Sequence, residues 1–181
     1  MSPWPAAAVG ALVAVAIAAV LPRAVSRLPE PAPSSEVPEG EPPKVPYTEL
    51  AGTAALRVWG PVVSALVAAA LAARLGWSHH LLVLVPVVPV GVALAYIDWR
   101  TRLLPRLLVL PATAMAVVAG FVGWFLTGSA DDLVRALIGM AATFGLYWLL
   151  WWVHASGMGF GDVRLSALLG FALGHVGWSE L

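Results

Sequence analysis

Cysteine and charge are both scarce in this sequence. No cysteine is present, which excludes disulfide bonds, thiolate catalysis and cysteine-based zinc sites. Charged residues make up only 11% of the 181 residues, against about 25% in ordinary soluble domains. The ten basic and ten acidic residues cancel to a formal net charge of zero. A neutral chain with so little charge lacks the basic surface that nucleic acids require, so we predict no nucleic-acid partner.

Apolar residues are correspondingly abundant. They account for 60% of the chain, and the mean hydropathy is +0.87. A soluble domain of this length leaves roughly a third of its unfolded surface exposed to water, so it could not hide this much apolar area. The composition therefore excludes a conventional cytosolic enzyme and an intrinsically disordered protein. It indicates membrane lipid as the solvent and as a partner of the chain.

Apolar runs long enough to cross a membrane recur along the sequence. A spanning helix needs about 20 mostly apolar residues, and about 17 are tolerated. The candidate segments are 4–21, 58–75, 81–97, 104–127, 133–153 and 163–179. We therefore predict an all-α fold, a polytopic transmembrane helix bundle of about six spans.

The composition divides the chain into three parts. Residues 1–21 form a first transmembrane anchor, and residues 58–181 form a membrane domain with the remaining spans. Residues 22–57 between them are rich in proline and glutamate, a composition that favours disorder over a packed core. We predict a solvated, largely disordered cytoplasmic loop there.

The basic residues predict the orientation in the membrane. No lysine or arginine precedes the first apolar run, whereas Arg23 and Arg27 follow it, which is typical of an uncleaved anchor with its N-terminus outside. From that start, Arg74 and Arg135 lie outside. The other eight of the ten basic residues lie inside: Arg23, Arg27, Lys44, Arg57, Arg100, Arg102, Arg106 and Arg164. This bias supports both the number of spans and the orientation.

Two aspartates mark one membrane face. Asp98 follows an apolar run at the cytoplasmic end of the third predicted span, and Asp162 lies at the cytoplasmic start of the sixth. Two intervening spans return the chain to the face it left, so we expect both carboxylates at the same depth on the same side. Asp131 and Asp132 fall in an outside turn, and we interpret them as solvated caps of the next helix.

A pair of carboxyls at a membrane edge has a specific chemistry. Acidic groups are costly there and indicate a functional site. Two carboxyls close together in a low-dielectric site share one proton. The ionised group can take a proton from water, and the protonated group can polarise a carbonyl. Because such a pair titrates as a unit, neither residue is assigned permanently to either role.

Three glycines alternate just before Asp162. Gly157, Gly159 and Gly161 allow positive φ and carry no Cβ. We predict that they let an extended substrate backbone approach Asp162.

These residues carry a family resemblance. Residues 157–165 read GMGFGDVRL, and residues 98–105 read DWRTRLLP. The first resembles the G-x-G-D signature of intramembrane aspartyl proteases, in its type IV prepilin peptidase branch, and the second resembles that family's first catalytic loop. The resemblance covers roughly residues 58–181. It implies that Asp98 and Asp162 are the catalytic pair, with no cofactor.

The resemblance also implies a substrate and a location. The family cleaves the short basic leader from prepilin or pseudopilin proteins at the cytoplasmic face of the bacterial cytoplasmic membrane, just after a glycine. A basic leader would dock on acidic groups, and the candidates are Glu30, Glu36, Glu39 and Glu41. The alternative, that these glutamates only solvate the loop, is left open.

Three features depart from the family pattern. Arg106 stands where the family has an asparagine after the loop proline. The paired cysteines of the zinc-binding domain that accompanies N-methylation are absent, so we expect no methyltransferase activity by that route. Family members continue with further spans, so we expect a chain that is shortened at its C-terminus or completed by a partner.

The histidines do not form a recognisable metal motif. His79 and His80 lie in an outside turn, and His154 ends the fifth span. His175 is interpreted either as a packing residue or as one that faces a polar cavity. No histidine pair shares ligand spacing with an acid. We predict no metal.

Two other functions fit the same residues. The chain could be a small transporter or proton-relay subunit, whose acids would be needed for flux while no leader is cut. It could also be an inactive family member that acts in pilus or secretion assembly, in which Asp→Asn changes would have no effect. The oligomeric state is left open.

Overall fold

The computed structural model describes residues 4–30, 45–154 and 158–181, whose regular secondary structure is all helical, with no strand among them. The elements are α1 (Trp4–Val25), α2 (Tyr47–Gly52), the π-helix η1 (Ala55–Trp59), α3 (Gly60–Leu75), α4 (His80–Thr101), α5 (Arg106–Thr127), α6 (Asp131–Val153), α7 (Phe160–Val176) and the short 3-10 helix η2 (Trp178–Glu180). The predicted all-α class is confirmed.

Five helices of the described residues are long and apolar enough to cross a membrane. They are Trp4–Val25, Ala55–Leu75, His80–Thr101, Arg106–Thr127 and Asp131–Val153. The sixth predicted span corresponds to α7, whose 17 residues lie at the lower limit for a spanning helix. The chain is therefore a multi-pass helical membrane protein.

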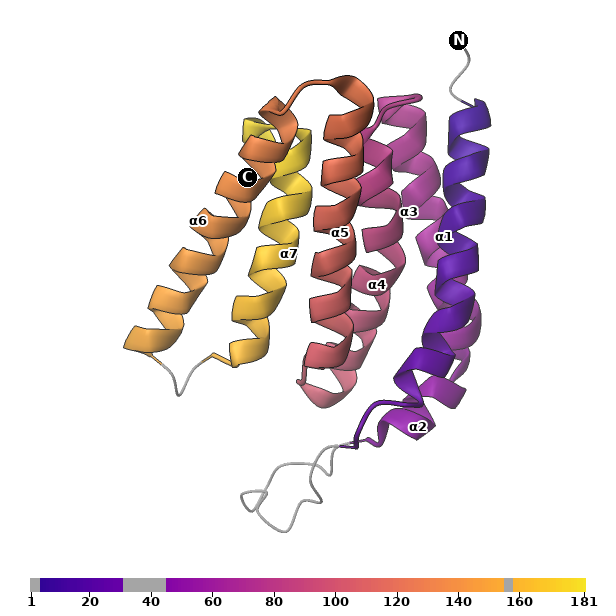
Figure 1. Cartoon of the computed structure of the whole chain (residues 1–181). Coiled ribbons are helices and arrows are strands. Elements are labelled where there is room, and N and C mark those ends of the chain that lie inside the picture. The colour runs from indigo at the N-terminus through magenta and orange to yellow at the C-terminus, as the bar shows by residue number, and fades with distance from the viewer. Residues whose placement is uncertain (1–3, 31–44, 155–157) are drawn as a thin grey trace.

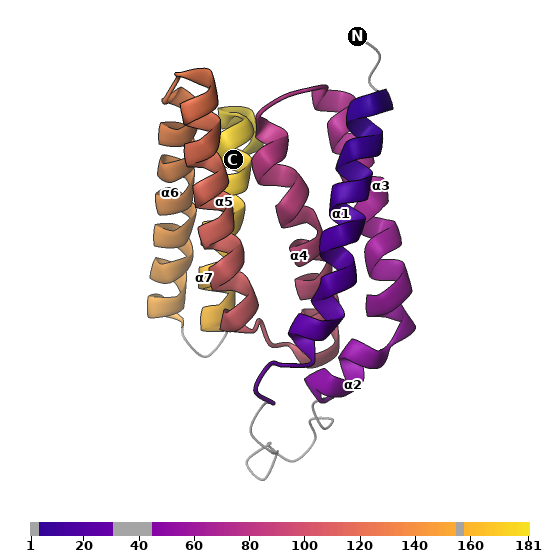
Figure 2. The same ribbon diagram turned by 45° about the vertical axis from the view of Figure 1, so that its right-hand side comes forward.

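The helices form two groups joined by α4 (Figures 1 and 2). α1 packs beside α3, α6 packs beside α7, and α4 contacts both α1 and α5. Half of the apolar window of α4 is buried inside the protein, against 17–28% for the other four spanning helices. α4 is thus the central helix, and its two ends are well placed to organise sites at the two ends of the bundle.

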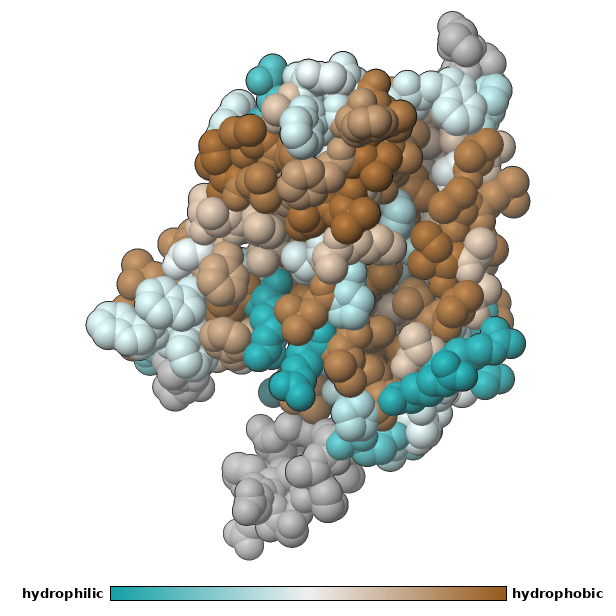
Figure 3. Space-filling model, in the orientation of Figure 1, coloured by the Kyte–Doolittle hydropathy of each residue, from teal (hydrophilic) through white to brown (hydrophobic). Residues whose placement is uncertain are grey.

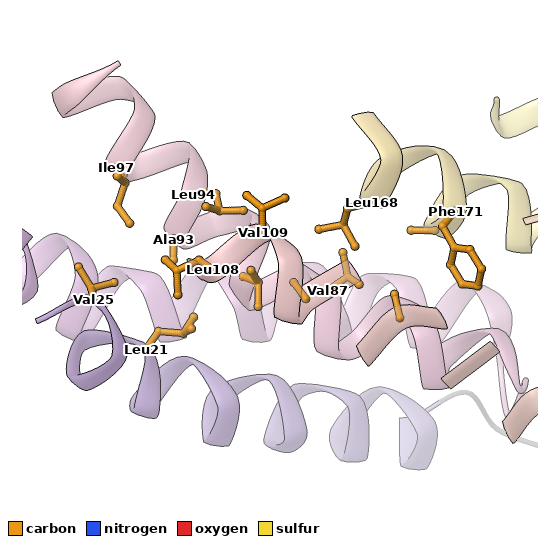
Figure 4. Close-up of a cluster of buried hydrophobic side chains, with 14 of the residues drawn as sticks. Leu21, Val25, Val87, Ala93, Leu94, Ile97, Leu108, Val109, Leu168 and Phe171 are labelled. Atoms are coloured by element: carbon orange, nitrogen blue, oxygen red, sulfur yellow. The ribbon is translucent and has the colours of Figure 1, made fainter. Parts of the chain in front are cut away.

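Apolar side chains fill the space between these helices and also cover the outside. Leu94, Val109, Leu168 and Phe171 are fully buried in one cluster between α4, α5 and α7 (Figure 4). Figure 3 shows hydrophobic residues over much of the surface, with hydrophilic residues gathered mainly toward the lower end of this face. An outer surface of this kind fits a lipid environment.

The segment predicted as a disordered loop is partly folded, which corrects that expectation. α1 continues to Val25, and α2 and η1 form before α3 begins. Leu28, Leu50 and Leu56 are buried in the main core. The composition of residues 22–57 did not predict the burial of these three leucines, because the leucines flank the proline-rich run and do not belong to a long apolar run. Residues 31–44, with Glu36, Glu39 and Glu41, lie outside the described residues.

Glu30 holds the start of α2 in place. Its carboxylate accepts hydrogen bonds from the backbone amides of Tyr47 (2.6 Å) and Thr48 (3.0 Å) and from the Thr48 hydroxyl (2.9 Å). These donors include amides that a helix start leaves without a partner. The carboxylate is therefore engaged within the protein, in contrast to the expectation of a docking or purely solvating role.

Candidate active site

Asp98 lies in the last turn of α4, and a tight reversal of the chain follows it. Arg102 ends the helix with φ 52° and ψ 34°, the left-handed conformation, and its amide donates to the Asp98 carbonyl at 2.7 Å. The buried Thr101 hydroxyl donates to the Ile97 carbonyl at 2.8 Å and accepts from the Leu103 amide at 3.3 Å. These bonds hold the Asp98 end of α4 in a defined shape.

Asp162 lies in the first turn of α7, close to where the helix begins. Its amide donates to the Gly159 carbonyl at 3.1 Å, and its side chain is partly exposed. An acidic residue in the first turn is favoured by the helix dipole. The end of α4 and the start of α7 lie at the same end of the bundle, the lower end in Figure 1.

Both aspartates line one cleft of about 630 Å³ at this end, which we call the aspartate cleft. Its lining residues are Pro29, Tyr47, Asp98, Arg102, Leu103, Leu104, Gly159, Phe160, Gly161 and Asp162. The structure thus places Asp98 and Asp162 at the same end of the bundle, as the alternation of spans predicts. Two carboxyl groups on one open cleft are the groups that general acid–base cleavage of a peptide bond uses. Their catalytic role stays a prediction.

The backbone of the glycines before Asp162 has ordinary conformations where the structure describes it. Gly159 has φ −71° and ψ 142°, and the positive-φ glycines of the described residues are Gly76 and Gly128. Gly159 and Gly161 therefore do not use the positive φ that glycine allows, and their predicted role toward a substrate stays a prediction. Gly157 lies outside the described residues.

Gly161 is needed for a close approach between two segments of the cleft. A Cβ at this position would lie 2.8 Å from the Leu104 Cβ, closer than side-chain carbons pack. The absence of a side chain lets the first turn of α7 sit against the turn between α4 and α5. A Cβ at Gly159 would meet only the Asp162 Oδ2, at 3.7 Å, and the Gly161 amide, at 3.9 Å, so that position has room.

Of the basic residues near the two aspartates, Arg102 lines the cleft. The Arg164 guanidinium instead stacks over the Phe160 ring, 4.6 Å from its centroid, and the Phe160 ring packs edge-on against Trp151 at 5.0 Å. This stack joins the end of α6 to the start of α7. It keeps the Arg164 charge on the helix that carries Asp162.

Sequence reasoning missed two residues of the cleft, Pro29 and Tyr47. Both belong to the segment predicted as a loop. Tyr47 is only 5% exposed. The hydrogen bond from its backbone amide to the Glu30 carboxylate holds it close to Pro29, the neighbour of Glu30 in the chain. The sequence signal that could have indicated the burial of Tyr47 is an aromatic residue close to Val45 and Leu50 in an otherwise polar stretch.

Comparison with known proteins places these residues within one family. The family model for the type IV leader peptidase family matches residues 85–180, a range that contains both aspartates. The chain is 36% identical over 118 residues to a prepilin leader peptidase/N-methyltransferase of Pseudomonas putida, covering 65% of this chain and 40% of that protein. It is 33% identical over 121 residues to the protein of the same name from Aeromonas hydrophila, covering 66% and 40%.

A further relative with this name, from Escherichia coli K12, is 35% identical over 89 residues, covering 49% of this chain and 38% of that protein. The chain thus matches two fifths or less of the length of these curated relatives. No solved structure matches the chain significantly. Because the family model covers more than half of the sequence and includes both aspartates, the chain belongs to the type IV leader peptidase family.

Proposed function

We propose that the chain is an aspartic endopeptidase of the bacterial cytoplasmic membrane, which cleaves the basic leader from prepilin or pseudopilin substrates at the cytoplasmic face. Asp98 and Asp162 form the catalytic pair. The observation that carries the proposal is that both carboxylates line one cleft at one end of the bundle. Both also lie inside the region matched by the family model.

The two carboxyls share one proton in this mechanism. The ionised carboxyl takes a proton from a water molecule as the water oxygen attacks the peptide carbonyl carbon. The protonated carboxyl donates to the carbonyl oxygen and stabilises the charge that develops there. When the tetrahedral intermediate collapses, the C–N bond breaks and the leaving amine takes a proton from the pair. The chemistry uses water and the two carboxyls.

The substrate reaches the cleft from the membrane. The apolar helix of a prepilin lies in lipid beside the bundle, and its leader extends to the cleft at the helix end. Gly159 lines the cleft beside Asp162, and a Cβ there would have room, so a substrate backbone can approach Asp162 at this position. This geometry suits an extended peptide.

The charge distribution supports the cytoplasmic orientation of the cleft. Arg23 lies in the last turn of α1, Arg100 in the last turn of α4, and Arg106 at the start of α5. These positions share the cleft end of the bundle (Figure 1). Basic residues concentrate on the cytoplasmic side of membrane proteins.

Co-expression with a substrate tests the proposal. A prepilin-like protein with a basic leader is expressed with the wild type, Asp98→Asn, Asp162→Asn or Asp131→Asn, and its mass is read by gel shift and mass spectrometry. Asp131 is an exposed acid at the start of α6, so it is the matched control. We expect cleavage by the wild type and Asp131→Asn only. Cleavage by both cleft variants at the wild-type level would overturn the assignment.

A further inference from the structure

Three histidines meet at the end of the bundle opposite the aspartate cleft. His79 directly precedes α4, His80 is its first residue, and His175 lies in the last turn of α7. Asp98 and Asp162 lie at the other ends of these two helices, and the 22 residues of α4 span about 33 Å. We call these three residues the histidine cluster. The fourth histidine of the chain, His154, follows the end of α6.

The ring nitrogens of the cluster are spaced as metal ligands. One nitrogen from each histidine lies within 4.8 Å of the others, and the Nδ1 atoms of His80 and His175 are 3.1 Å apart. Two nitrogens bound tetrahedrally to zinc at 2.0–2.1 Å would lie about 3.3 Å apart. The backbone and packing therefore already hold these two rings near the separation that one ion requires.

A carboxylate orients the third ring. Asp132 Oδ2 lies 2.7 Å from His79 Nε2, which leaves His79 Nδ1 as the free ligand atom of that ring. A carboxylate behind a ligating histidine fixes the ring and raises its basicity, as in many zinc sites. Asp132 is therefore more than the solvated cap expected from its place before the fifth predicted span.

Arg135 locks the carboxylate and ties α6 to α7. Its guanidinium donates to Asp132 Oδ1 at 2.6 Å and to the carbonyls of Gly174 at 2.6 Å and His175 at 2.9 Å. The charges of Arg135 and Asp132 offset each other. An ion in the cluster would thus be bound by neutral imidazoles, and the groups around these imidazoles are already held in place by hydrogen bonds.

The cluster is closed toward the protein and open toward the end of the bundle. A Cβ on Gly123 of α5 would lie 3.5 Å from His79 Cδ2 and 3.7 Å from His175 Nε2, so the α5 backbone closes that side. His175 is 1% exposed, whereas the His79 side chain is 26% exposed. The partial exposure of His79 gives an ion a path to the cluster from solvent.

We propose that His79, His80 and His175 bind one late first-row divalent metal ion, with Zn²⁺ as the best fit to three imidazoles and a water molecule. Binding needs a lone pair on both facing Nδ1 atoms, so the proton they share in the hydrogen bond moves to Nε2 of its ring. The ion clamps the start of α4 to the end of α7. This site is separate from the aspartate cleft and does not depend on the proposed peptidase activity.

Zinc binding to the full chain tests the proposal. The protein is purified in detergent with a tag that contains no histidine, stripped with a chelator, and titrated with ZnCl₂ by calorimetry. We expect one Zn²⁺ per chain, affinity at least tenfold weaker in His80→Gln, and a ten- to a hundredfold loss in Asp132→Asn. His154→Gln is the matched control and should bind as the wild type does.

A second measurement on the wild type covers the case in which a variant fails to fold. X-ray absorption spectroscopy of the zinc-loaded protein should show about three imidazole nitrogens at about 2.0 Å. A spectrum without imidazole scattering would overturn the proposal. So would wild-type protein that binds no zinc, or equal losses of binding in His80→Gln and His154→Gln.

Discussion

Arg102 has the only positive φ among the described non-glycine residues, and it lies in the aspartate cleft. The left-handed conformation costs an ordinary residue roughly 1–2 kcal/mol. Here the left-handed conformation of Arg102 lets the chain reverse soon after Asp98, and the hydrogen bond from the Arg102 amide to the Asp98 carbonyl closes this turn. Strain of this kind is concentrated at functional sites. The turn therefore lowers local stability, and it fixes the position of Asp98 at the end of α4.

Two substitutions at this residue separate backbone strain from the loss of the guanidinium. Both Arg102→Gly and Arg102→Val remove the charge, but only glycine adopts the left-handed conformation without steric cost. We expect the glycine variant to be more stable than the valine variant by about 1–2 kcal/mol. Thermal unfolding in detergent measures the difference. Equal stability of the two variants would show that the turn carries no strain.

Gly161 and Gly159 form a second matched pair in the same cleft. A Cβ at Gly161 would collide with Leu104, and one at Gly159 would make ordinary contacts. We expect Gly161→Ala to destabilise the protein by about 1–3 kcal/mol through overpacking, and Gly159→Ala to leave the free energy of unfolding nearly unchanged. Thermal unfolding of both variants checks this. A larger loss in Gly159→Ala would contradict the assigned packing.

At the scale of elements, α6 and α7 pack closely because glycines face each other across the pair. A Cβ on Gly139 would lie 2.6 Å from the Gly170 carbonyl oxygen. The Thr143 hydroxyl bridges the helices with a 2.8 Å bond to the Ser166 carbonyl. Small residues and interhelical hydrogen bonds of this kind drive helix association in membranes. This contact supports the α7 turn that carries Asp162.

The close contact predicts a contrast between two glycines of α6. Gly139→Ala places a methyl group against the α7 backbone, so we expect a loss of about 1–3 kcal/mol. Nothing lies within 4 Å of a Cβ at Gly145. Gly145→Ala should therefore be neutral or stabilising by up to about 1 kcal/mol, because alanine favours the helix. Chemical unfolding in mixed micelles compares them, and a reversed order would refute the packing argument.

The Glu30 bonds to α2 predict a pH dependence. Desolvation raises the pKa of Glu30, but the bonds from the Thr48 and Tyr47 amides and the Thr48 hydroxyl outweigh it and hold the pKa below 4.5. A lowered pKa in the folded state stabilises α2 above the unfolded pKa, and this contribution is lost as the pH falls through the folded pKa. We expect the protection of the Tyr47 and Thr48 amides from exchange, relative to the unfolded chain at the same pH, to fall across that acidic range.

A substitution should reproduce this effect at neutral pH. Glu30→Ala should speed exchange of the same two amides at pH 7, whereas Glu49→Ala, an exposed residue of α2, should not. Hydrogen–deuterium exchange with mass spectrometry measures both. Unchanged exchange in Glu30→Ala would show that the cap does not hold α2.

For the whole molecule, the alternation of spans and turns was the most informative sequence signal. It predicted the helical class, and it predicted that Asp98 and Asp162 lie at the same end of the bundle although they belong to separate helices. The same argument, applied to His80 and His175, would have predicted the histidine cluster. This cluster was not predicted from the sequence, because metal ligands were sought at short spacings along the chain. His80 and His175 are 95 residues apart, so no local spacing indicates their contact.

Other features depend on tertiary contacts that no local pattern encodes. The packing of Leu50 and Leu56 into the core requires the neighbouring helices, so composition alone predicted a loop there. The need for glycine at 161 comes from Leu104, a residue on another turn. Glycine permits positive φ but does not require it, so the sequence could not predict the backbone conformation at Gly159.

The central claim is that Asp98 and Asp162 act as one catalytic unit, and the rates of the two single variants and the double variant test it most directly. Purified wild type, Asp98→Asn, Asp162→Asn and the double variant are incubated with a prepilin-like substrate, and products are quantified by mass spectrometry. Residues that act as a unit have non-additive effects. The account predicts leader cleavage by the wild type and an equally complete loss in all three variants. Wild-type cleavage by either single variant, or partial losses that multiply in the double variant, would contradict it.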